Sequence, residues 1–183
     1  MSANVISGRV WKFGDNINTD LMLPGHVHMA TEAEQARAVF QANRPGWVDE
    51  MKPGDFIIGG KNYGTGSSRP AARSLRNIGI ACLIADSINS LMYRNCVNFG
   101  LLAIECPGVS TLFGEEGQIA EVSLEDFTIQ NKTTGKALKA QPVPANMLTL
   151  MCGGGIYPVL EQEGLIAPKP KTEKPAKVST GHT

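Results

Sequence analysis

No stretch of the sequence is apolar over a long distance, and neither sign of charge dominates. A membrane-spanning helix needs about 18 or more apolar residues in a row, and no run here approaches that length. The 17 Lys and Arg residues balance the 17 Asp and Glu residues. This neutral balance does not support a surface that binds nucleic acid. The N-terminal residues lack the charged and apolar regions of a signal peptide, so we expect a cytoplasmic chain with neither membrane nor nucleic-acid partner.

The sequence also lacks paired cysteines. Its four cysteines are Cys82, Cys96, Cys106 and Cys152, and no two have C-x-x-C spacing. Zinc and iron–sulfur sites normally show close pairs or a clustered set. Scattered cysteines in a cytosolic chain are usually free, buried thiols. We therefore expect no metal site in this chain.

The composition indicates one domain followed by a tail. A chain of 183 residues with 42% hydrophobic content can bury a substantial core. From Pro168 onward, Pro, Lys, Thr and Ser replace the large apolar residues, which is typical of a flexible segment. We expect a domain over residues 1–167 and a flexible tail over residues 168–183.

Apolar runs alternate with helical patterns along the domain. The expected strands cover residues 5–13, 56–58, 80–85, 101–104, 118–122 and 127–130. The expected helices cover residues 31–42, 70–78, 88–95 and 144–151. Thr31 and Glu34 have the spacing of a capping box, and Asp86 and Ser87 are candidate caps for the helix that follows them. This order predicts an α/β fold.

The segment from residue 61 to residue 104 is the most informative. Its Gly-Thr-Gly-Ser-Ser loop precedes Pro70, which suits the first turn of a helix. Ser67 or Ser68 is then a natural N-cap, and Gly79 is a good residue to end the helix. The free N–H groups and the positive end of such a helix favour an anion.

Arg69 lies within this loop and can add a planar, two-pronged contact to a carboxylate or phosphate. The loop has no lysine of a Walker A motif. It also lacks the third glycine of a dinucleotide fingerprint, because Arg69 stands there. Taken alone, the loop is more typical of a plain helix cap, so a functional interpretation depends on the rest of the segment.

Three sequence words in this segment match one family. They are Asn-Tyr-Gly-Thr-Gly-Ser-Ser-Arg at residues 62–69, Tyr-Arg-Asn at 93–95 and Asn-Phe-Gly-Leu-Leu at 98–102. Together they resemble the small subunit of isopropylmalate dehydratase, which corresponds to the swivelling domain of the aconitase superfamily. The resemblance covers roughly residues 5–160 and implies a single swivelling β/β/α domain.

The resemblance implies a hydro-lyase that dehydrates or isomerises a hydroxy dicarboxylic acid, such as 3-isopropylmalate in leucine biosynthesis. Ser67 matches the serine that acts as base in aconitase. By the same match, Ser68 would donate a hydrogen bond to the substrate carboxylate and Arg69 would pair with it. Thr19 and Asp20 match a second word of the family and would complete the pocket. We expect Asp20 to be buried, where it could orient an arginine or a substrate hydroxyl.

The sequence departs from the family pattern at two places. His26, Val27 and His28 stand where an Arg-Tyr-Leu word is usual, in the loop that helps to choose the substrate's γ-substituent. Pro70 and Ala71 replace the usual Glu-His. Homoaconitate, dimethylmalate, citramalate-like and methylcitrate-type acids therefore stay open as substrates. The two histidines could also suggest a metal, but no third ligand is evident.

The resemblance implies that the chain is inactive alone. A [4Fe–4S] cluster is expected in a large subunit of the same superfamily, in a heterodimer or heterotetramer. Two other functions stay open. Residues 67–69 could form an anion-binding module without chemistry. The chain could also regulate by binding RNA, as some aconitase relatives do, although its neutral charge argues against this.

Overall fold

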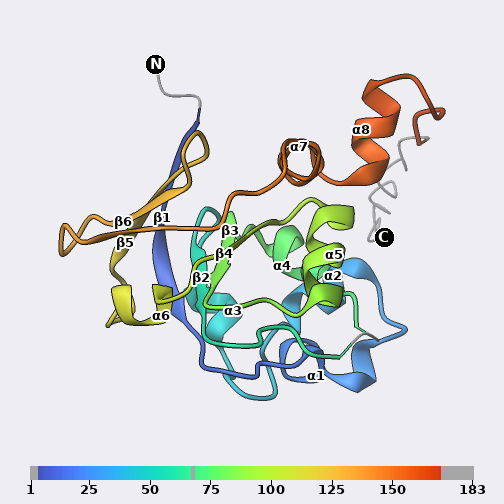
Figure 1. Cartoon of the computed structure of the whole chain (residues 1–183). Coiled ribbons are helices and arrows are strands. Elements are labelled where there is room, and N and C mark those ends of the chain that lie inside the picture. Colours follow the sequence, from blue (N-terminus) through green and yellow to red (C-terminus); the bar gives the residue numbers. More distant parts are fainter. Residues whose placement is uncertain (1–3, 67–68, 170–183) are drawn as a thin grey trace, which may run out of the picture.

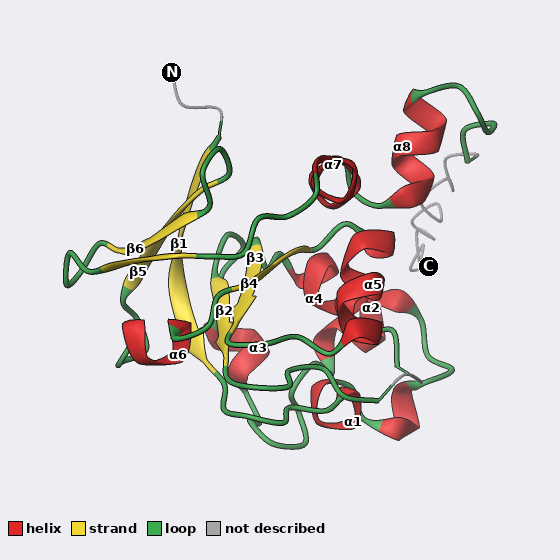
Figure 2. Cartoon of the chain, in the orientation of Figure 1, coloured by secondary structure: helices red, strands yellow, loops and turns green. Residues whose placement is uncertain are grey.

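A computed structural model describes residues 4–66 and 69–169, and these form a mixed seven-stranded sheet with helices around it (Figures 1 and 2). The strands lie in the order β4-β3-β2-β1-β5-β6-β7. Their bounds are β1 (Val5–Lys12), β2 (Phe56–Gly59), β3 (Cys82–Ala85), β4 (Leu102–Glu105), β5 (Ile119–Ser123), β6 (Thr128–Asn131) and β7 (Ala137–Lys139).

Strand β1 joins two halves of the sheet. Its first part pairs antiparallel with β5, from Val5 to Arg9, and its last part pairs parallel with β2, from Val10 to Lys12. Strands β2, β3 and β4 continue the parallel half, whereas β5, β6 and β7 form an antiparallel half. The carboxyl ends of four parallel strands therefore lie at one edge, where open α/β sheets place their ligands.

Helices follow each parallel strand, and two more follow the last antiparallel strand. They are α1 (Thr19–Met22), α2 (Glu32–Arg37), α3 (Trp47–Glu50), α4 (Ala71–Ile78), α5 (Ser90–Phe99), α6 (Val109–Leu112), α7 (Ala145–Cys152) and α8 (Ile156–Gln162), with a 3₁₀ turn η1 (Gly25–Val27). Helices α2, α4 and α5 pack side by side next to the parallel strands (Figure 1). Helix α6 contacts β2 and β3, so these two strands are covered and wholly buried.

Four aromatic side chains fix the end of β1 against the segments that follow α2. The rings of Phe13 and Phe40 stack with centroids 4.0 Å apart. Trp47 meets Phe13, Phe40 and Trp11 edge to face, a favourable geometry for aromatic rings. All four are buried. This cluster anchors the loop that leaves β1 and leads to Thr19.

The predicted α/β order is confirmed, and most predicted elements lie within a few residues of the observed ones. The capping box is present, because Thr31 Oγ1 accepts from the Glu34 N–H while the Glu34 carboxylate accepts from the Thr31 N–H. Helix α2 ends at Arg37, earlier than predicted, and α8 was not predicted.

The observed N-caps of two helices are residues that were not predicted as caps. The N-cap of α4 is Pro70, so the helix begins at Ala71, and the predicted caps Ser67 and Ser68 lie outside the described residues. The N-cap of α5 is Asn89 rather than Asp86 or Ser87, and its side chain accepts from the Leu91 N–H. Helix α5 also extends to Phe99, which puts the 93–95 word inside the helix instead of at its end.

Further predictions concerned the cysteines, membrane-spanning helices and the C-terminal tail. All four cysteines are free; Cys82, Cys96 and Cys106 are buried and Cys152 is exposed. No helix in the described part of the chain has the length and apolar character needed to cross a membrane. Most of the predicted tail, residues 170–183, lies outside the described residues.

Candidate active site

Two loops at the carboxyl edge of the parallel strands run alongside each other. One follows β1 and the other follows β2, and they form an isolated parallel bridge between Asn18 and Thr65. The Thr19 N–H donates to the Thr65 carbonyl over 2.8 Å, and the Gly64 N–H donates to the Ile17 carbonyl over 2.6 Å. The predicted Thr19–Asp20 word is thereby held against the predicted Gly/Ser loop.

Thr19 lies closely against the glycine of that loop. The residue is 2% exposed, and a Cβ added to Gly66 would lie 2.8 Å from Thr19 Oγ1. Gly66 has φ +85°, in the left-handed region that favours glycine. Asn18 starts α1 by accepting from the Leu21 N–H, which fixes the turn that carries Thr19.

Arg69 and Asp20 form an ion pair across the two loops. Arg69 Nε lies 3.1 Å from Asp20 Oδ1, although the N–H does not have the alignment of a hydrogen bond. The Arg69 side chain is 20% exposed and that of Asp20 is 68% exposed. The expectation of a buried Asp20 is therefore wrong, because Thr19 is the buried member of the word.

The far end of the Arg69 guanidinium lies beside η1. A Cβ on Gly25 would stand 3.0 Å from Arg69 Nη2, so a larger residue here would displace the guanidinium. The sequence interpretation missed Gly25, and only its place directly after Pro24 in a turn hinted at a role. Arg69 thus contacts both the Asp20 segment and the start of η1.

The predicted specificity residues lie on η1 and its end. His26 and His28 are exposed, whereas Val27 is partly buried and packs against the core. Among the described residues, no three His, Cys, Asp or Glu side chains converge in a way that could hold a metal ion. The two histidines therefore present polar groups at the surface, on the turn whose first residue, Gly25, lies against Arg69.

Two predicted site residues, Ser67 and Ser68, lie outside the described residues. Their described neighbours are Gly66, which contacts Thr19, and Arg69, which pairs with Asp20. The structure therefore brings together the predicted residues on either side of the serines.

The second departure from the family pattern affects the core. Ala71 is 1% exposed and opens α4 after Pro70. A residue this deeply buried has no surface for a ligand. Ala71 therefore packs within the core at the start of α4, whereas Pro70 is partly exposed.

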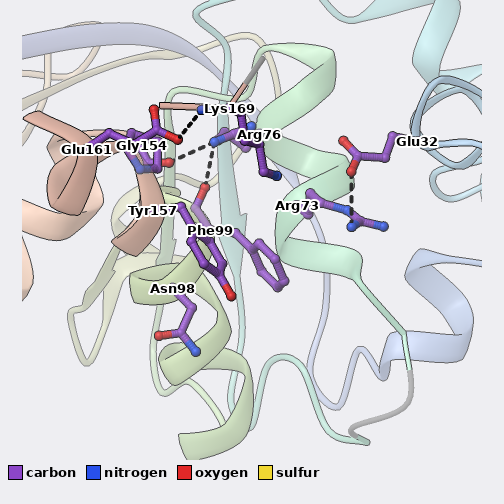
Figure 3. Close-up of a pocket in the computed structure, with 10 residues that line it drawn as sticks. Glu32, Arg73, Arg76, Asn98, Phe99, Gly154, Tyr157, Glu161 and Lys169 are labelled. Carbon is purple, nitrogen blue, oxygen red and sulfur yellow. Dashed lines mark hydrogen bonds and ion pairs between the residues drawn. The ribbon is translucent and has the colours of Figure 1, made fainter. Parts of the chain in front are cut away.

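A hollow of about 340 Å³ lies between α4, α5 and α8 (Figure 3). Arg73, Arg76, Phe99 and Tyr157 contribute to its wall. Arg76 is held there by the carbonyls of Phe99 and Gly154, at 3.0 and 2.8 Å. Neither Thr19 nor Arg69 lines this hollow, so it is separate from the loop pair.

Fold and loop pair together define a domain of the aconitase C-terminal type. The model of the aconitase C-terminal domain family matches residues 14–108, which include both loops and the parallel strands β2, β3 and β4. The predicted resemblance to this superfamily is thus confirmed.

Individual relatives identify the family more narrowly than the domain model does. The chain is 44% identical to the isopropylmalate/citramalate isomerase small subunit of Methanocaldococcus jannaschii, over 87% of this chain and 96% of that one. It is 39% identical to a 3-isopropylmalate dehydratase small subunit of Methanopyrus kandleri, over 88% and 95%. A crystal structure of 3-isopropylmalate dehydratase from M. jannaschii superposes with a TM-score of 0.80 at 30% identity, covering 88% of this chain and 96% of that one. The chain belongs to the family of isopropylmalate dehydratase small subunits.

Proposed function

We propose that this chain is the small subunit of a two-chain hydro-lyase that isomerises a branched hydroxy dicarboxylic acid. The observation that supports this most is the contact between the two loops, in which Arg69 pairs with Asp20 and Gly66 lies against Thr19. This arrangement brings together a cation, a carboxylate and a hydroxyl, and two of the residues involved, Gly66 and Arg69, flank Ser67 and Ser68 in the sequence. Its position at the carboxyl edge of the sheet agrees with the usual place of ligands in such folds.

In the proposed reaction, a proton leaves the carbon next to a carboxylate and hydroxide leaves the neighbouring carbon, and the two together make up the water that is lost. Ser67 is proposed to take the proton, and Ser68 to donate a hydrogen bond to the substrate carboxylate. Arg69 is proposed to bind that carboxylate with its planar guanidinium. Its charge would also stabilise the negative charge that develops in the transition state. Asp20 would fix the direction of the guanidinium through the contact at Nε.

The proposal requires a large subunit. A [4Fe–4S] cluster, where one takes part, would act as Lewis acid on the substrate hydroxyl, and we assign it to the large subunit. The described part of this chain offers no converging ligands for it, and three of the four cysteines are buried. A heterodimer or a heterotetramer would fit the family name.

The proposed substrate is 3-isopropylmalate or its 2-isomer, with citramalate as the second candidate. Both acids occur in the name of the M. jannaschii relative. They differ at the γ-position, which His26, Val27 and His28 are proposed to contact. A cytoplasmic location and a domain that ends near residue 167 remain part of the same proposal.

The test is anaerobic co-purification with a candidate large subunit, followed by dehydration assays on isopropylmalate, citramalate and homoaconitate. The same assays are run with Ser67→Ala and with Ser7→Ala, an exposed serine of β1 at a distance from the loops. We expect a stable complex in all three cases. Ser67→Ala should lower kcat by at least about a hundredfold, as expected for a lost general base, and Ser7→Ala should match the native complex.

Two results would contradict the proposal. Activity that survives Ser67→Ala would remove the serine from the chemistry. A native complex that forms but converts none of the acids would leave only anion binding at residues 67–69.

A further inference from the structure

A buried glutamine on α2 connects η1 to the helix that follows Arg69. Gln35 is 3% exposed. Its side-chain nitrogen donates to the carbonyls of Val27 and His28, at 3.2 and 3.0 Å. Its side-chain oxygen accepts from Arg73 Nη2 at 3.0 Å. The amide nitrogen therefore binds the segment with the predicted specificity residues, and the amide oxygen binds α4.

Arg73 is itself fixed. Its Nη1 lies 3.2 Å from Glu32 Oε1 (Figure 3), and its guanidinium carbon lies 5.7 Å from the centre of the Phe99 ring. Asn77 adds a hydrogen bond to the same Glu32 carboxylate, over 3.3 Å. Arg73 lies on α4, the helix that begins two residues after Arg69, so Gln35 is attached to the element that directly follows the proposed carboxylate-binding arginine.

The segment from residue 25 to residue 28 is therefore held at both ends relative to α4. At its start, Gly25 lies against Arg69 Nη2. At its end, Gln35 holds two successive carbonyls. Between these points His26 and His28 are exposed, and Met29, just beyond, is 91% exposed. The segment is otherwise fixed by Val27, which packs on the core, and by the backbone hydrogen bonds of the 3₁₀ turn itself.

We propose that Gln35 is a positioning residue for substrate selection, which sets the distance between the γ-substituent loop of residues 26–28 and the carboxylate site at Arg69. The separation of these two points then decides which substrates can contact both of them at once. An unbranched amide is suited to this because it satisfies two carbonyls and one guanidinium at once. This inference rests on the proposed function, since it assumes that residues 26–28 face the substrate.

Two substitutions test the hydrogen bonds of the Gln35 amide, one by removing its donor and the other by removing all of its hydrogen bonds. Gln35→Glu keeps an acceptor for Arg73 but removes the donor, and it turns a carboxylate oxygen toward two carbonyl oxygens. Gln35→Met keeps the volume and removes every hydrogen bond. Asn77→Ala is the matched control, because it removes a bond between the same two helices and leaves Gln35 intact.

The measurement is kcat/KM for isopropylmalate and for citramalate with each reconstituted complex. We expect Gln35→Glu and Gln35→Met to change the ratio of the two values by about tenfold, the size of discrimination that a small apolar group provides. The change should appear mainly in KM. Asn77→Ala should leave the ratio within about twofold of the native value, because it keeps all three hydrogen bonds of Gln35 and removes an exposed bond to Glu32.

A second measurement needs no partner. The chain has three histidines, and two of them are His26 and His28, so their ring proton signals in an NMR spectrum report on the segment directly. Single His→Gln variants assign them. We expect both signals to shift or broaden in Gln35→Glu and to stay in place in Asn77→Ala.

The outcomes are distinguishable. A native complex that converts neither acid contradicts the proposed function, whereas the histidine signals still test the link made by Gln35. An active native complex whose substrate ratio is unchanged in both Gln35 variants overturns the inference alone. Unchanged histidine signals in Gln35→Glu also overturn it, as would a failure of both variants to fold, which would make Gln35 a purely structural residue.

Discussion

Gly66 and Thr19 are in contact at the centre of the loop pair, and no side chain fits between them. A Cβ on Gly66 would lie 2.8 Å from Thr19 Oγ1, closer than a carbon and an oxygen can comfortably approach. Thr19 cannot yield easily because it is 2% exposed and its N–H is bonded to Thr65. The glycine therefore sets how closely the two loops approach.

Gly66→Ala should consequently separate the loops and damage the site. We expect kcat/KM of the reconstituted complex to fall by about a hundredfold, the effect of a displacement near 1 Å in a catalytic arrangement. Left-handed backbone alone costs alanine about 1 kcal/mol. Assays and thermal unfolding of the variant would measure the two effects separately.

Gly117→Ala is the matched control for backbone strain. Gly117 has φ +82° and open space around its Cβ position, compared with φ +85° for Gly66. It should lose similar stability but keep its activity. Equal activity losses in both variants would attribute the effect to strain and contradict the role of the Thr19 contact.

The Asp20–Arg69 pair leads to a second prediction. Arg69→Lys keeps the charge but loses the planar, two-pronged grip, so KM should rise by about tenfold or more. Asp20→Asn should act through Arg69 and raise KM less. Because the Asp20 side chain is 68% exposed, its loss should change the free energy of unfolding by less than about 1 kcal/mol.

Asp49→Asn gives the control for this pair. Asp49 lies 3.2 Å from Arg37 in an ion pair whose side chains are 74% and 75% exposed. It should affect neither KM nor stability measurably. If Asp20→Asn left KM at the native value, Asp20 would have no part in orienting Arg69.

Local sequence signals predicted the frame of the site better than its details. The apolar runs correctly predicted β2, β3 and β4, because a parallel strand that is covered on both faces must be apolar on both. Gly79 ends α4 with φ +102°, as expected. Such features depend on neighbouring residues alone, and a sequence displays them directly.

The wrong predictions have their causes in distant contacts. Asp86 and Ser87 have the right chemistry for a cap, but Asp86 accepts from the Gly108 and Ser110 N–H groups and Ser87 Oγ accepts from the Asn62 N–H. Asn89 therefore caps α5. Gln35 was missed for a similar reason, because Arg73 lies 38 residues away and its other two partners are backbone carbonyls of another element.

A buried carboxylate at the start of the sheet predicts a pH-dependent stability. Asp55 Oδ2 accepts from Arg9 Nη2, Trp11 Nε1 and the Lys52 N–H, at 2.8, 2.7 and 2.9 Å. Burial alone would raise the pKa of Asp55, but these hydrogen bonds outweigh it and leave the pKa below its usual value. The ionised form is therefore favoured in the folded chain.

Because the folded-state pKa lies below the unfolded one, Asp55 stabilises the fold above about pH 4. This contribution is lost as the pH falls through the folded-state pKa. Asp55→Asn should lower the free energy of unfolding by about 2 kcal/mol at pH 7, and the difference should shrink below pH 4. Urea unfolding at several pH values measures it. A difference that is constant from pH 7 to the acid range would contradict the assignment.

The four cysteines predict a selective pattern of alkylation. Burial raises the pKa of Cys82 and Cys96 above the usual thiol range, and it raises the pKa of Cys106 to about 11. Cys152 is the exposed one, although partial burial also raises its pKa. Since the thiolate is the reactive form, iodoacetamide at pH 8 should modify the native chain once, at Cys152.

Mass spectrometry should show one added group on the native subunit, four after unfolding in guanidinium, and none on native Cys152→Ser. The buried thiols should then react only as fast as the chain opens, because in the folded state they stay protonated and are shielded from solvent. Their slow labelling would measure the opening of the sheet, since Cys82 lies on β3 and Cys106 directly follows β4. Rapid modification of either in the native chain would contradict the burial of these strands, and with it the support that they give to the loop pair.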